Sequence, residues 1–180
     1  MTLANKITIA RIACVPAFLT ALLNHRFQIA TILGILIVLT DALDGTIARR
    51  FKQKTPLGSL LDPMADKLLL LGTYGVLVYM ELLPSWVFVV ILSRDIVVVF
   101  GWLLIYLLTN SMKILPRKLG KASTAFQMIY VLFLLLGRAF LPFPPWLNSA
   151  LLAGMVALTA SSMLDYLVSG SRILSQQGQA

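Results

Sequence analysis

Four aspartates are the residues whose type and spacing could carry chemistry. The chain has seven acidic side chains, and four of them fall between positions 41 and 66: Asp41, Asp44, Asp62 and Asp66. Carboxylate oxygens are the ligands that hard cations such as Mg²⁺, Mn²⁺ or Ca²⁺ prefer. Four carboxylates can hold two such ions about 4 Å apart, which clamps the attacking and leaving oxygens during displacement at phosphorus. The aspartates therefore predict a two-metal site for the transfer of a phosphorus-containing group.

The spacing of these residues predicts that they line two neighbouring helix faces. Asp41 and Asp44 are three residues apart, whereas Gly58, Asp62 and Asp66 recur every four residues. Residues three or four apart lie on the same side of an α-helix. The short intervening stretch should make the two helices antiparallel neighbours. We therefore expect the four carboxylates to converge on one pocket, with a cation among them to offset their repulsion.

The helices that position these residues are predicted to cross a membrane. Hydrophobic residues make up 59% of the 180, charged residues make up 12%, and the mean hydropathy is +0.89. A helix of roughly 20 apolar residues spans a bilayer core of about 30 Å. Six such runs lie between polar or proline breaks, at about 9–24, 28–48, 57–80, 85–108, 119–140 and 146–169. The expected fold is an all-α polytopic membrane protein with six transmembrane helices, a short interfacial helix at 2–8, and one membrane domain over 1–180.

Basic residues predict the orientation of these helices. Arg26 and Arg138 alone mark one side. The other side collects Lys6, Arg11, Arg49, Arg50, Lys52, Lys54, Lys113, Arg117, Lys118, Lys121 and Arg172. The positive-inside rule then places both termini and the aspartates at the cytoplasmic side. The +8 net charge is interleaved with apolar runs, which argues against a nucleic-acid partner and favours anionic lipid headgroups and phosphorylated substrates.

The full pattern around the aspartates resembles the signature of the CDP-alcohol phosphotransferase family. It reads D-x-x-D-G-x-x-A-R, eight residues, then G-x-x-x-D-x-x-x-D, and its fixed positions are Asp41, Asp44, Gly45, Ala48, Arg49, Gly58, Asp62 and Asp66. The resemblance covers the whole chain, including its six predicted spans. A cation path in a transporter is the remote alternative, but such sites usually lie near the bilayer midplane, often within internal repeats. Here the carboxylates lie at one membrane edge and no repeat is evident.

The resemblance implies a role for each position of the signature. Asp41, Asp44 and Asp62 would bind two Mg²⁺ or Mn²⁺ ions, and Asp66 would complete the second ion's shell and act as general base. Gly45, Ala48 and Gly58 would let the nucleotide approach the helix backbones, and Arg49 would meet the donor phosphate. The family moves a substituted phosphoryl group from a CDP-linked donor, here CDP-diacylglycerol, to an alcohol and releases CMP. It usually forms homodimers, and the N-terminus, which does not resemble a transit peptide, favours a bacterial plasma membrane.

The acceptor alcohol is left open between two subfamilies. One resembles phosphatidylglycerophosphate synthase, which uses glycerol 3-phosphate, and the other resembles eukaryotic-type cardiolipin synthase, which uses phosphatidylglycerol. Two cations of the glycerophosphate enzymes are missing here, because Trp102 and Ser123 stand in their places. Less charge favours phosphatidylglycerol as acceptor. Candidate acceptor-binding residues are Arg94, Arg117, Lys118 and Lys121, with Asp95 expected to point away from the helix face that Arg94 occupies. His25 and Asp165 receive no assigned role.

Overall fold

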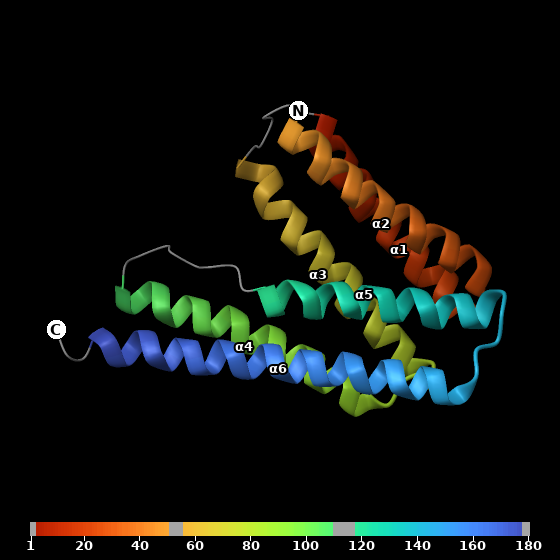
Figure 1. Cartoon of the computed structure of the whole chain (residues 1–180). Helices are drawn as coiled ribbons and strands as arrows, with labels where there is room; N and C mark the ends of the chain where they lie inside the picture. The colour runs from red at the N-terminus through yellow and green to blue at the C-terminus, as the bar shows by residue number, and fades with distance from the viewer. Residues whose placement is uncertain (1–2, 51–55, 110–117, 178–180) are drawn as a thin grey trace. The chain divides into compact units, whose positions relative to one another are not determined.

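The computed structural model contains six α-helices and no strands in the residues that it describes (Figure 1). Backbone is described for 3–50, 56–109 and 118–177, and side chains for 10, 12–40, 66–101 and 119–169. The helices are α1 (Leu3–Leu23), α2 (Phe27–Arg50), α3 (Pro56–Tyr79), α4 (Ser85–Thr109), α5 (Lys118–Ala139) and α6 (Pro145–Gln177). The prediction of an all-helical chain is confirmed, and each helix overlaps one expected run.

Two helix boundaries differ from the prediction. Residues 3–8 are the first turns of α1, which continues without a break to Leu23, so they form no separate helix in the described backbone. Helix α6 extends to Gln177, beyond the end that hydropathy predicted. Its last turns are polar, and helical backbone hydrogen bonds do not require an apolar sequence.

Two tight turns end α1 and α3 in the same way. After α1, His25 N donates to Leu22 O and Arg26 N donates to Ala21 O, both at 2.9 Å. The same pair of bonds follows α3, centred on Glu81. This is the Schellman arrangement, in which the residue after the helix adopts a left-handed conformation. His25 and Glu81 do so with φ of 55° and 58°, although glycine is more usual there.

One compact unit contains α1, α2, α3 and the end of α5, over Met1–Leu83 and Val131–Phe143. Helix α1 packs against both α2 and α3. Its buried face carries Val15, Phe18 and Leu22, at helical spacing. Gly34 of α2 allows this contact, because a Cβ there would lie 3.3 Å from the Phe18 ring. Small residues permit such close helix packing in membranes, where lipid is as apolar as leucine.

A second compact unit contains α4, most of α5 and α6, over Pro84–Tyr130 and Pro144–Ala180. Helices α4 and α6 pack against each other. The buried residues of this unit are apolar towards one end, where Val87, Ile91 and Met155 lie. Towards the other end of the unit the buried residues are polar and include Arg94, Gln127 and Thr159. Hydrogen bonds between polar side chains hold membrane helices together where hydrophobic attraction is weak.

Two helices among the described residues are long and apolar enough to cross a membrane, Leu119–Ala139 and Pro145–Ser169. The described parts of α1 and α2 contain shorter apolar stretches, Ile12–Leu23 and Phe27–Thr40. Large apolar side chains are exposed along several helices, as lipid contact requires. Six membrane spans and their orientation stay predictions.

Candidate functional site

The aspartate signature lies on the end of α2 and the start of α3. Asp41 and Asp44 belong to the C-terminal half of α2, and Asp62 and Asp66 to the N-terminal half of α3. Both helix ends lie at the same end of their unit (Figure 1). The halves of α2 and α3 that contain the aspartates therefore adjoin the connection between the two helices, and convergence of the four carboxylates on one pocket stays a prediction. Direct packing of α2 on α3 stays a prediction, since in the described part of this unit the closest packing is through α1.

The side chains of most signature residues lie outside the described residues. This holds for Asp41, Asp44, Gly45, Ala48, Arg49, Gly58 and Asp62, of which the structure gives the helical backbone. Asp66 is half-buried and has an interaction partner. The described residues contain no group of three potential metal ligands, and three of the four aspartates are outside that set. The metal site and the nucleotide contacts therefore stay predictions that rest on residue type and helix position.

A buried arginine forms the centre of a polar cluster in the second unit. Arg94 of α4 is 5% exposed, and its Nη1 donates to Asp95 Oδ1 at 2.8 Å. Its Nη2 donates to the carbonyl oxygen of Gly120 in α5 at 3.0 Å and approaches Ser162 Oγ of α6 at 3.4 Å. Three helices thus supply oxygen atoms to one guanidinium group. A buried guanidinium needs such hydrogen bonds, because an unpaired charge away from water is costly.

The contact between Arg94 and Asp95 corrects the sequence prediction. Adjacent helix residues have Cβ atoms that point about 100° apart, which led us to expect that Asp95 would leave the face that Arg94 occupies. The two side chains instead form a buried ion pair. The long arginine stem allows the guanidinium to reach back to its neighbour, so the Cβ directions do not decide the contact.

One donor of this guanidinium has no partner. Arg94 Nε is buried without a hydrogen bond in the structure. A guanidinium has five N–H donors in a fixed plane, and an unsatisfied buried donor costs about 1–3 kcal/mol. Both Nη atoms already have partners, so a ligand oxygen at this position would bond to Nε alone. Arg94 therefore keeps one unsatisfied donor inside the cluster, and its role in acceptor binding stays a prediction.

Gly120 permits the guanidinium to lie against α5. A Cβ at this position would be 3.1 Å from Arg94 Nη2 and 3.0 Å from Tyr166 Oη. Both distances are shorter than ordinary van der Waals contact, so a side chain at 120 would displace its neighbours. The glycine is thus explained by close approach of side chains to the backbone.

A hydrogen-bonded layer lies beside this cluster and was missed by the sequence analysis. Thr159 Oγ1 of α6 accepts from Gln127 Nε2 at 3.0 Å and lies 3.2 Å from Ser123 Oγ, both on α5. All three side chains are buried. Ser123 and Gln127 are four residues apart, and Thr159 and Ser162 are three apart, which places each pair on one helix face. That spacing within apolar helices is the signal that could have predicted the layer.

The other three predicted acceptor residues have no hydrogen bond with Arg94 in the described part of the chain. Lys121 lies one turn into α5 and is exposed. Lys118 is the first residue of α5, and its side chain lies outside the described residues, as does the whole of Arg117. The structure therefore brings Arg94, Gly120 and Ser162 together, and the roles of Arg117, Lys118 and Lys121 stay predictions.

Comparison with known proteins gives one family. The family model described as CDP-alcohol phosphatidyltransferase matches residues 1–165. A CDP-diacylglycerol–glycerol-3-phosphate 3-phosphatidyltransferase of Bacillus subtilis is 36% identical over 156 residues, covering 78% of this chain and 79% of that protein. A CMP-forming cardiolipin synthase of Streptomyces coelicolor is 36% identical over 144 residues, covering 76% and 65%. An Aquifex aeolicus protein with the same name as the Bacillus relative is 28% identical, covering 98% and 100%.

Proposed function

The chain belongs to the CDP-alcohol phosphatidyltransferase family, and we propose that it transfers the phosphatidyl group of CDP-diacylglycerol to the hydroxyl of a glycerol-type acceptor and releases CMP. The observation that carries this proposal is the family match over 1–165, which includes an aspartate signature without a departure. Relatives that bear both phosphatidyltransferase and CMP-forming cardiolipin synthase names support the donor and the leaving group.

The aspartates and their neighbours supply the reaction centre of the proposal. Asp41, Asp44, Asp62 and Asp66 would hold two divalent cations, which suit an all-carboxylate donor set and would neutralise charge on the donor pyrophosphate. Asp66 accepts the proton of the acceptor hydroxyl as general base. The hydroxyl oxygen forms a bond to the phosphorus that carries diacylglycerol, while the bond from that phosphorus to the CMP oxygen breaks. Gly45, Ala48 and Gly58 give the nucleotide access to the helix backbones, and Arg49 binds the donor phosphate.

Phosphatidylglycerol is the acceptor that the described residues favour. Arg94 would bind its phosphate through the unpartnered Nε. Asp95 already offsets the charge of this guanidinium, so the pair attracts a dianion less strongly than an isolated arginine would. Ser123, where a second lysine is missing, is buried against Thr159 and adds no charge. A monoanionic phosphodiester that the membrane already retains needs less attraction than a free dianion.

Glycerol 3-phosphate is the second candidate acceptor. The Bacillus and Aquifex relatives are named for that acceptor, and the Aquifex protein matches over nearly the whole of both chains. Arg94, Arg117, Lys118 and Lys121 are the cations that would bind its dianionic phosphate. An assay of this protein must therefore include glycerol 3-phosphate beside phosphatidylglycerol.

The proposal also includes a membrane arrangement. All six helices span the bilayer, both termini are cytoplasmic, and the aspartates lie at the cytoplasmic edge of a bacterial plasma membrane. A lipid donor can then keep its acyl chains in the membrane while its headgroup reaches the carboxylates, and CMP leaves into the cytoplasm. Residues 1–180 form one membrane domain in this proposal, and the protein works as a homodimer.

A competition between the two acceptors tests the acceptor assignment. Purified protein is supplied with CDP-diacylglycerol, Mg²⁺ or Mn²⁺, and equal amounts of phosphatidylglycerol and glycerol 3-phosphate, and the lipid products are identified by mass spectrometry. Cardiolipin as the main product supports the proposal. Phosphatidylglycerophosphate as the main product would replace it with the second candidate.

A further inference from the structure

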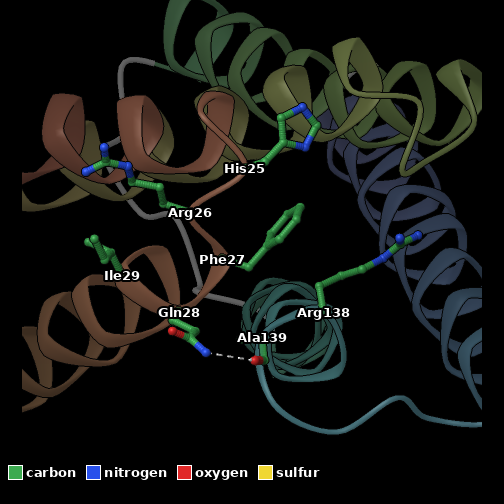
Figure 2. A pocket seen from close by; sticks show the side chains of 7 residues that line it. All are labelled: His25, Arg26, Phe27, Gln28, Ile29, Arg138 and Ala139. Carbon is green, nitrogen blue, oxygen red and sulfur yellow. Dashed lines mark hydrogen bonds between the residues drawn. The ribbon is translucent and has the colours of Figure 1, made fainter.

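A basic pocket of about 320 Å³ lies in the first unit beside the N-terminal end of α2, whereas the aspartates of this helix are in its C-terminal half. Figure 2 shows the residues that line the pocket. Its lining comes from the turn between α1 and α2 and from the last turn of α5: His25, Arg26, Phe27, Gln28, Ile29, Arg138 and Ala139. Gln28 Nε2 donates to the carbonyl oxygen of Ala139 at 3.5 Å and connects the two segments. Asp41 lies fourteen residues after Phe27 along α2, or roughly 21 Å away at about 1.5 Å per residue. The pocket is therefore separate from the reaction centre.

Two arginines at this pocket are the cations that the sequence places away from the aspartates. Arg26 and Arg138 are exposed, and neither has an ion-pair or side-chain hydrogen-bond partner within the described part of the chain. Their side chains lie on opposite sides of Phe27 and His25, and the two guanidinium groups point away from each other (Figure 2). Exposed arginine side chains can turn towards a ligand without breaking other contacts. The fold thus places two arginines, 112 positions apart in sequence, in the lining of one pocket, and both would have to turn inward to contact a shared ligand.

Helix dipoles and topology do not account for this arrangement. The C-terminus of α5 attracts a cation, which explains Arg138 alone. Arg26 lies between the C-terminus of α1 and the N-terminus of α2, whose dipole effects oppose each other. The predicted orientation places both cations on the side opposite the cytoplasm, where the positive-inside preference does not favour them. Two of them at one pocket indicate an anionic ligand.

An apolar stripe leads from the pocket along α2. Ile29, Ile32, Leu36 and Leu39 are 45–54% exposed and recur at helical spacing on one face. Ile29 belongs to both the pocket lining and the stripe. A ligand with a charged headgroup and an acyl chain would contact the arginines and the stripe together.

We infer that this pocket binds a phosphate group, and that the phosphate belongs to an anionic phospholipid in the leaflet opposite the aspartates. The guanidinium groups of Arg26 and Arg138 contact the phosphate oxygens, and the acyl chains lie against the α2 stripe. The residues of the site are different from those assigned to the donor and the acceptor, and the inference does not depend on the proposed reaction.

Lipid binding by the full-length protein tests this inference. The protein is purified in phosphatidylcholine nanodiscs or mixed micelles and titrated with phosphatidic acid, which is neither donor, acceptor nor product of the proposed reaction. Native mass spectrometry counts retained phosphatidic acid, and the thermal unfolding midpoint is followed in parallel. We expect wild type to retain one phosphatidic acid more than R26Q/R138Q. Each single substitution should weaken that binding about fivefold, and both together about 25-fold.

Matched variants and ligands make the outcomes distinguishable. Arg172→Gln removes the same charge near the far end of α6 and should bind like wild type, whereas R26K/R138K should retain most of the binding. Inorganic phosphate that raises the midpoint as much as phosphatidic acid would assign the pocket to a soluble anion and overturn the lipid source. Equal phosphatidic acid binding by wild type and R26Q/R138Q would overturn the site. If that variant does not fold, an unchanged midpoint of wild type on adding phosphatidic acid would overturn the site equally.

Discussion

Replacement of Gly120 by alanine is expected to disturb the Arg94 cluster, whereas the same change at Gly101 is not. A Cβ at Gly120 would lie 3.0 Å from Tyr166 Oη and 3.1 Å from Arg94 Nη2, so those groups must move by a few tenths of an ångström. A Cβ at Gly101 would have no neighbour within 4 Å. The pair isolates the effect of close approach, because both substitutions add one methyl group to a helix.

The size of the effect follows from two opposing contributions. Alanine in place of glycine within a helix stabilises by about 1 kcal/mol. A methyl group forced into an occupied space destabilises by about 1–3 kcal/mol. Gly101→Ala should therefore raise the free energy of unfolding by about 1 kcal/mol. Gly120→Ala should leave it unchanged or lower it by up to about 2 kcal/mol.

Displacement of the guanidinium should also affect acceptor binding. Hydrogen bonds to a charged group contribute about 1.5–3 kcal/mol, so loss of even one good contact corresponds to about a tenfold change in affinity. We expect Gly120→Ala to raise KM for the acceptor about tenfold while KM for CDP-diacylglycerol stays within twofold.

Thermal unfolding in detergent and steady-state kinetics with each substrate varied in turn provide the measurements. Identical unfolding midpoints for the two variants would refute the packing argument. Equal acceptor KM values, despite a lower midpoint for Gly120→Ala, would refute the role of Arg94 in acceptor binding and leave the packing argument intact.

Three further substitutions test other parts of the structure. Asp66→Asn should fold with an unchanged unfolding midpoint but reduce CMP release to background, and near-normal turnover would remove this residue from the role of base. Thr159→Val removes the acceptor of hydrogen bonds from two buried α5 side chains and should destabilise by about 1–3 kcal/mol, more than Ser161→Ala, whose hydroxyl bonds within α6. Gly137→Ala would put a Cβ 2.9 Å from a phenylalanine ring, against 3.8 Å for Gly154→Ala, so chemical denaturation should show that it alone destabilises. Equal midpoints within either matched pair would contradict the packing that the structure describes.

The helices could be predicted because their boundaries depend on local signals. Prolines begin α3 and α6, and short polar breaks separate the apolar runs. The aspartate signature was equally local, since its residues share two helix faces at fixed spacing. The end of α6 was not predicted, because the hydropathy pattern stops before Gln177 although the backbone hydrogen bonds continue.

The arrangement around Arg94 could not be read from the sequence, because it depends on which helices meet. Whether a buried arginine is satisfied by Gly120 O and Ser162 is decided by packing between helices that are distant in sequence. Its ion pair with Asp95 was missed because the rule for neighbouring helix residues describes Cβ directions and not the reach of a guanidinium. His25 had no role assigned from the sequence, and in the structure it is exposed and lines a basic pocket formed by two separate segments.

Release of CMP is the measurement that tests the central claim most directly. Purified full-length protein is given CDP-diacylglycerol and Mg²⁺ or Mn²⁺, with or without phosphatidylglycerol, and CMP is quantified together with the lipid product. The account predicts CMP release that requires phosphatidylglycerol and matches cardiolipin formation mole for mole. Absence of CMP with phosphatidylglycerol and also with glycerol 3-phosphate would contradict the proposed phosphatidyl transfer.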